Sequence, residues 1–70
     1  MNDLHSSDLI GAIGIITVPI EIDRPGEILL SVRGGSEAYT AISDEPIVKH
    51  SQAIVVEVRS ARSVFVTPFA

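Results

Sequence analysis

Short runs of β-branched residues alternate along the chain with clusters of turn-forming residues. The turn signals fall at residues 23–26, 34–36, 44–46 and 60–62, and the runs between them are rich in Ile, Val and Thr. Such runs at a spacing of roughly ten residues are typical of an all-β barrel or sandwich. Because no window of helical length keeps an apolar stripe free of Gly and Pro, the pattern predicts no long helix.

Five strands are predicted, at residues 9–22, 27–33, 37–43, 52–59 and 63–67. Alternation with a period of two sorts their side chains into an inner and an outer face. The residues predicted to face the core in the second, fourth and fifth strands are Ile28, Leu30, Val32, Ile54, Val56, Val58, Val64 and Val66. Leu29, Val55 and Phe65 are out of phase with these residues, so they are predicted to face outward.

The first run is too long to lie flat on so small a sheet. Gly11 and Gly14 lie inside it, where glycine marks a bulge or a sharp bend at a barrel corner. A long, bent first strand followed by a hairpin and two further strands predicts a small closed barrel of five strands. We assign residues 9–70 to this domain, and residues 1–8, which are mostly small and polar, to a flexible lead-in.

The composition limits the classes of function. The chain has 70 residues, of which 46% are hydrophobic and only 4% aromatic, so the expected core is small and aliphatic. It has no cysteine, which excludes disulfides and thiolate zinc sites. The net charge of −4 disfavours nucleic-acid backbones and anionic membrane surfaces as partners. No apolar run approaches the roughly 20 residues that a transmembrane helix needs.

One acidic segment combines residue types that are common in active sites. Asp44, Glu45, Lys49 and His50 lie within a few residues of one another, between the third and fourth predicted strands. Asp and Pro are also standard turn formers, and a surface turn gives a general base little of the desolvation that shifts a pKa. The only other histidine, His5, lies in the lead-in, away from this segment. We therefore interpret the segment as a turn, without a metal or a catalytic role.

Two further patterns are also explained better by structure than by chemistry. The glycines at 34 and 35 are not followed by the Lys-Ser or Lys-Thr that a phosphate-binding loop requires, so they predict a hairpin turn. None of the serines lies in a Gly-x-Ser-x-Gly motif. The sequence accordingly predicts no catalytic residue, no metal ligand and no cofactor.

Four segments carry a resemblance to a known family: LIGAIGIITVPI (9–20), RPGEILLSVRGG (24–35), YTAISDEPIVKHSQAIVVEVRS (39–60) and SVFVTP (63–68). In this order and spacing they resemble the C-terminal soluble domain of the NfeD-like family, which implies an OB-like five-stranded barrel. The family usually has Gly after the lysine at position 49, where this chain has His50. If that position requires a positive φ, histidine is one of the less costly alternatives.

The resemblance also implies a function. Family members commonly follow transmembrane helices, and their genes pair with those of stomatin- or flotillin-type membrane scaffold proteins. We therefore expect a non-enzymatic protein–protein interaction domain that binds or regulates such a scaffold. The full-length protein is expected to be membrane-associated, with this domain on the cytoplasmic side. Two alternatives stay open, namely regulation of a membrane protease and binding of single-stranded nucleic acid.

The predicted partner-binding residues are Leu29, Val55, Glu57, Arg59 and Phe65. The first, second and fifth are the apolar residues that the alternation places on the outer face, where a cluster of them would form a docking surface. The nucleic-acid alternative requires a basic groove with several aromatic platforms. The chain has three aromatic residues and five basic residues against nine acidic ones, so we do not expect nucleic acid as a partner.

Overall fold

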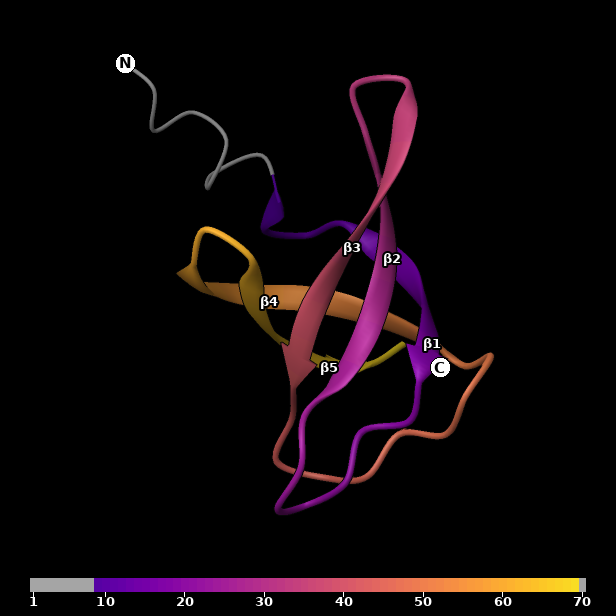
Figure 1. The fold of residues 1–70 in the computed structure, drawn as a ribbon, viewed down its shortest axis with the longest axis vertical. Coiled ribbons are helices and arrows are strands. Elements are labelled where there is room, and N and C mark those ends of the chain that lie inside the picture. Colours follow the sequence, from indigo (N-terminus) through magenta and orange to yellow (C-terminus); the bar gives the residue numbers. More distant parts are fainter. Residues whose placement is uncertain (1–8, 70) are drawn as a thin grey trace.

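Five strands close into a barrel in the order β1-β2-β3-β5-β4 (Figure 1). The computed structural model describes residues 9–69. Its strands are β1 (Ile13–Val18), β2 (Gly26–Val32), β3 (Gly35–Ile42), β4 (Gln52–Ser60) and β5 (Ser63–Pro68). Neighbouring strands are antiparallel, except that β3 and β5 pair in parallel. The predicted all-β, five-stranded closed barrel is confirmed, while the predicted lead-in at 1–8 lies outside the described residues.

The core is almost entirely aliphatic. Its buried hydrophobic residues are Leu9, Ile16, Ile20, Ile28, Leu30, Tyr39, Ala41, Ile47, Ala53, Val55, Val64 and Val66. The inward orientation predicted for Ile28, Leu30, Val64 and Val66 is confirmed, and Val32 packs partly buried against the same cluster. Each fully buried Val, Leu or Ile side chain stabilises the fold by about 1.5–3 kcal/mol, which makes this cluster the main source of stability.

The fourth strand has the opposite phase from the one predicted. Val55 is 1% exposed and belongs to the core, whereas Val56 is 46% exposed. A register shift between Val55 and Glu57 inserts one extra residue into β4, so the next side chain that packs against the core is Val58, three positions after Val55 and partly buried as predicted. The predicted inward orientation of Val56 and half-buried Ile54, and the outward orientation of Val55, are therefore wrong.

The first run is also different from the prediction, because β1 covers only Ile13–Val18. Gly11 lies before this strand at φ 91°. Gly14 lies within it, and a Cβ atom there would come within 2.4 Å of the Leu29 backbone oxygen and 2.6 Å of the Leu30 side chain. Gly14 thus permits close approach of β1 to β2, rather than a bend in one long strand.

Two loops meet at the end of the barrel that lies lowest in Figure 1. Ile20 and Ile47 form an isolated bridge between them, with N–H···O distances of 2.9 and 3.0 Å. Ile47 is buried in the core although it lies in the β3–β4 loop. His50 has φ 77°, so the position where the family usually carries glycine does require a positive φ. Its N–H donates to the Ile16 carbonyl at 2.7 Å, which attaches the loop to β1.

Candidate interaction surfaces

The acidic segment between β3 and β4 is a surface turn. Asp44, Glu45, Lys49 and His50 are all exposed, and the Glu45 N–H donates to the Ser43 hydroxyl oxygen at 3.3 Å. This side-chain bond is the type by which serine stabilises a turn. Within residues 9–69, we find no group of three or more His, Asp or Glu side chains close enough to hold a metal ion. The arrangement is consistent with a structural turn.

Three of the five predicted partner-binding residues lie together on β4 and β5. The Arg59 Nε lies 3.0 Å from a Glu57 carboxylate oxygen, and the Arg59 guanidinium carbon lies 5.0 Å from the centroid of the Phe65 ring. Glu57 and Phe65 are also direct register partners. Leu29 is exposed as predicted, but it lies on β2, which β1 separates from β4. Val55 is buried in the core and has no surface to offer a partner.

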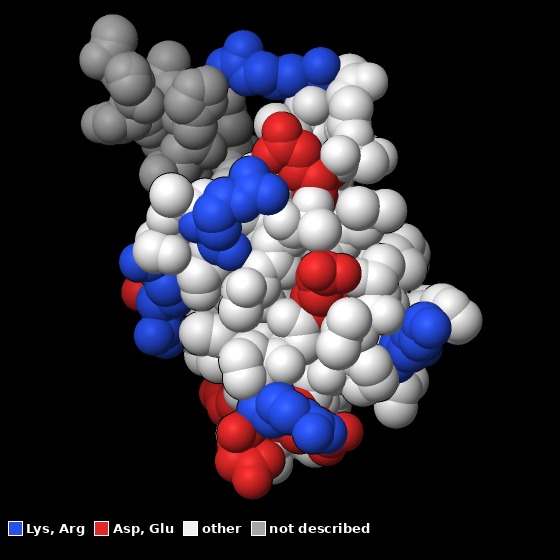
Figure 2. Space-filling model, viewed as in Figure 1, with Lys and Arg blue, Asp and Glu red and all other residues white. Residues whose placement is uncertain are grey.

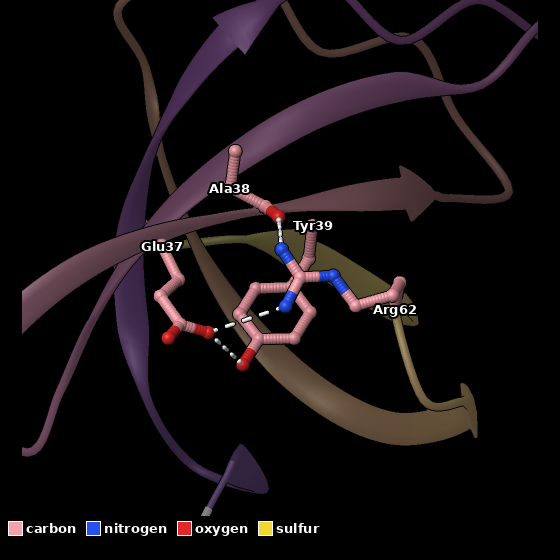
Figure 3. Close-up of polar contacts among 4 residues, drawn as sticks. All are labelled: Glu37, Ala38, Tyr39 and Arg62. Atoms are coloured by element: carbon pink, nitrogen blue, oxygen red, sulfur yellow. Dashed lines mark hydrogen bonds and ion pairs between the residues drawn. The ribbon is translucent and has the colours of Figure 1, made fainter.

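A second arginine joins the β4–β5 turn to β3 (Figure 3). Arg62 Nη2 donates to the Ala38 carbonyl oxygen at 3.0 Å, and Nη1 lies 3.3 Å from Glu37 Oε1. The same guanidinium lies over the Tyr39 ring, 4.9 Å from its centroid. In the backbone, the Thr40 N–H donates to the Arg62 carbonyl oxygen at 2.9 Å. Arg62 therefore holds the turn against the outer edge of β3.

Tyr39 carries the one resolved pKa shift among the described residues. Burial raises the pKa of its hydroxyl above the ordinary value of 10.0. The hydrogen bond that the hydroxyl donates to Glu37 at 3.2 Å, together with the negative charge of that carboxylate, raises the pKa further, while Arg62 lowers it. Tyr39 is thus a protonated hydrogen-bond donor at neutral pH.

The positions of the arginines and aromatic rings disfavour the nucleic-acid alternative. Single-strand binders stack bases on open aromatic faces along a basic groove. Here the rings of Tyr39 and Phe65 each lie under a guanidinium group, and both arginines are also paired with a carboxylate. In Figure 2, the Lys and Arg side chains are scattered over the face shown, while Asp and Glu gather mainly at its lower end. This face offers no continuous basic groove.

A band of exposed aliphatic side chains crosses three strands. Ile15 on β1 is the register partner of Leu29 on β2, and Ile13 on β1 is the partner of Ile54 on β4. Ile13, Ile15 and Leu29 are 42%, 39% and 39% exposed, and Ile54 is half-buried. We call these four residues the β1 band. Only Leu29 was predicted as an interaction residue, because the first run is apolar on both faces and its outward residues are not marked by polar neighbours.

A comparison with known families decides the identity of the fold. The family described as NfeD C-terminal domain matches residues 13–67, which is most of the chain. The chain belongs to this family. The match begins and ends with the barrel itself, from the first residue of β1 to the penultimate residue of β5.

Two solved structures are similar to this NfeD domain. One is the solution structure of the soluble domain of the NfeD protein YuaF from Bacillus subtilis, with 27% identity and a TM-score of 0.74 over 87% of this chain and 74% of the other. The other is the C-terminal domain of stomatin operon partner protein 1510-C from Pyrococcus horikoshii. It has a TM-score of 0.71 over 93% of this chain and 94% of the other, and at 24% identity it shows the shared fold alone.

No curated protein matches the chain. In the part of the chain that the structure describes, no helix has the length and apolar character needed to cross a membrane.

Proposed function

We propose that this NfeD domain is a non-enzymatic protein–protein interaction module. Its partner is a stomatin- or flotillin-type membrane scaffold, which it binds or regulates. The full-length protein is membrane-associated, and this domain lies on the cytoplasmic side of the membrane. The name of the similar Pyrococcus horikoshii protein, stomatin operon partner, supports a scaffold of the stomatin type as the partner.

The observation that carries this proposal is the β1 band. Its four aliphatic side chains form one contiguous surface because they are register partners on neighbouring strands. Isolated exposed aliphatic residues are normal on a protein surface, whereas contiguous patches are typical of interaction sites. Ile15, Leu29 and Ile54 are each paired with both neighbouring strands, so a partner at these positions is recognised through side chains rather than through a free strand edge.

The proposal is tested by recovery of an identified partner. The 70-residue domain is immobilised and exposed to the membrane fraction of its source cell, and bound stomatin- or flotillin-type proteins are identified by mass spectrometry. We expect such a scaffold to be retained by the domain and not by an unrelated acidic barrel of similar size. Recovery of a membrane protease without a scaffold would support protease regulation instead and would refute the proposal.

Binding to oligo-dT is the matching test of the nucleic-acid alternative. With a net charge of −4 and with Tyr39 and Phe65 covered by arginines, we expect no measurable binding, even at low salt, where phosphate contacts are strongest. Salt-sensitive binding to oligo-dT, with no scaffold recovered, would overturn the assignment.

A further inference from the structure

The β1 band has defined dimensions. It runs diagonally from Leu29 on β2, through Ile15 and Ile13 on β1, to Ile54 on β4. Two strand spacings of about 4.8 Å and a two-residue step of about 6.6 Å make this diagonal about 12 Å long. Two turns of an α-helix have nearly the same length, about 11 Å. A helix lying along the diagonal would therefore place side chains at i, i+3 or i+4, and i+7 against the four residues.

The band is too small for a folded partner to bind to it alone. A standard interface uses about 20–30 residues on each side. The β1 band has only four residues, of which Ile54 is half-buried. This size fits one face of a short helix better than the surface of a second copy of the domain.

The charges around the band select the polar face of such a helix. None of the four band residues is charged, and the nearest ionisable group along β2 is Glu27, two residues from Leu29 on the same face. The Thr17 hydroxyl donates to a Glu27 carboxylate oxygen at 2.9 Å, which holds this negative charge at the border of the band. Because the whole chain has a charge of −4, two copies would repel each other, whereas a basic segment would be attracted.

We propose that the β1 band binds a short amphipathic helix of the protein partner, with aliphatic anchors about seven residues apart and Lys or Arg beside them. The inference rests on the proposed function, because it specifies the segment of the scaffold that the domain recognises. Amphipathic helices that bind through their apolar face use a few aliphatic anchors at i, i+3 or i+4, and i+7. Basic residues on the helix would interact with Glu27 and with the general negative field of the domain.

The test is a titration of the isotope-labelled 70-residue domain with a defined peptide, followed by NMR. The probe is an 18-residue amphipathic helix with leucine on one face and lysine on the other, and its control is the same peptide with glutamate in place of lysine. We expect saturable shift changes centred on Ile13, Ile15, Leu29 and Ile54 with the lysine peptide only. Equal binding of both peptides, or changes centred on Phe65, would overturn the inference.

Matched variants separate specific docking from general attraction of a basic peptide. Ile15→Glu places a carboxylate in the band, while Ile22→Glu makes the same change at a 69% exposed position in the β1–β2 loop. We expect Ile15→Glu to weaken binding by at least about tenfold and Ile22→Glu by less than about twofold. Equal effects of the two variants would contradict the proposal. Leu29→Glu provides a second disruptive change if Ile15→Glu proves unstable in urea.

Other occupants of the band give distinguishable results. A monomer–dimer equilibrium in sedimentation that Ile15→Glu abolishes would assign the band to a second copy and overturn the inference. If the domain bound neutral phosphatidylcholine vesicles and this binding displaced the peptide, the β1 band would be a lipid-binding surface, and the inference would also be overturned. If wild-type domain and Ile15→Glu retain equal amounts of the scaffold from membranes, the helix-docking inference fails while the proposed function stands. If no scaffold is retained by wild type, the proposed function fails.

Discussion

The guanidinium carbon of Arg62 lies 4.9 Å from the centroid of the Tyr39 ring, although the two residues belong to different parts of the barrel. Arg62 follows β4 in the turn to β5, and Tyr39 lies in the middle of β3. The β3–β5 pairing covers only Thr40 to Ile42 on the β3 side. Arg62 therefore extends the contact between these segments beyond the strand pairing.

We predict that Arg62→Ala destabilises the domain by about 1 kcal/mol. The residue combines an exposed ion pair, a stacking contact and a hydrogen bond to Ala38, each of which contributes modestly at a solvent-exposed site. Urea denaturation measures the change. Arg24→Ala, in the loop before β2, is the matched control and should alter the free energy of unfolding by less than about 0.5 kcal/mol. Equal effects would show that Arg62 adds nothing to the turn.

The single tyrosine makes the pH dependence directly measurable. We predict that the ultraviolet absorbance of tyrosinate in the folded domain titrates with a pKa above 10.0. Because folding raises the pKa of Tyr39, the protonated hydroxyl contributes to the free energy of unfolding. This contribution is fully present below the unfolded-state pKa and is lost as the pH rises through the folded-state pKa. Glu37→Gln should lower the folded-state pKa, because it removes a negative charge, and Arg62→Ala should raise it. A rise of the Tyr39 pKa with Glu37→Gln, or a fall with Arg62→Ala, would contradict the assigned contacts.

Gly14 and Gly35 provide a matched test of close strand packing. We predict that Gly14→Val destabilises the domain by about 1–3 kcal/mol, because a Cβ at Gly14 would come within 2.4 Å of the Leu29 backbone oxygen. A Cβ at Gly35 would lie 3.8 Å from the Val32 backbone oxygen, an ordinary contact distance, so Gly35→Ala should be nearly neutral. An unchanged urea midpoint for Gly14→Val would show that β1 and β2 do not approach so closely.

The bulge in β4 predicts opposite outcomes for two adjacent valines. Val55 is a core residue, so Val55→Ala should cost about 2 kcal/mol through lost burial and a residual cavity. Val56 is exposed, so Val56→Ala should change the free energy of unfolding by less than about 0.5 kcal/mol. Thermal or urea unfolding of the pair measures both values. If Val56→Ala lowered the free energy of unfolding more than Val55→Ala, Val56 rather than Val55 would face the core, as simple alternation predicts.

The sequence predicts the architecture well because turn chemistry separates the strands. Clusters of Gly, Pro, Asp and Ser mark four of the turns, and in β2 the polar residues Glu27 and Ser31 indicate which face is outward. In β4, four successive apolar residues from Ala53 to Val56 do not indicate which pair faces inward, and the bulge leaves no mark in the sequence. The predicted bounds of the first strand are wrong for a related reason, since apolar residues continue beyond both ends of β1.

The candidate surface was predictable only in part. The outward orientation of Leu29 follows from alternation within β2, but its position beside Ile15 depends on the register between strands, which alternation does not determine. The contact of Glu57 and Arg59 with Phe65 likewise depends on the pairing of β4 with β5. The Arg62 contacts join residues 24 and 25 positions apart and have no local signal. Such contacts arise from the closed barrel as a whole.

The most direct test of the central claim compares scaffold retention by three forms of the immobilised domain. Wild type, Ile15→Glu and Ile22→Glu are exposed to the same membrane fraction, and the retained stomatin- or flotillin-type protein is quantified. The account predicts equal retention by wild type and Ile22→Glu, and loss of most of it by Ile15→Glu, because only this variant changes the β1 band. No retention of a scaffold by wild type would contradict the proposed function.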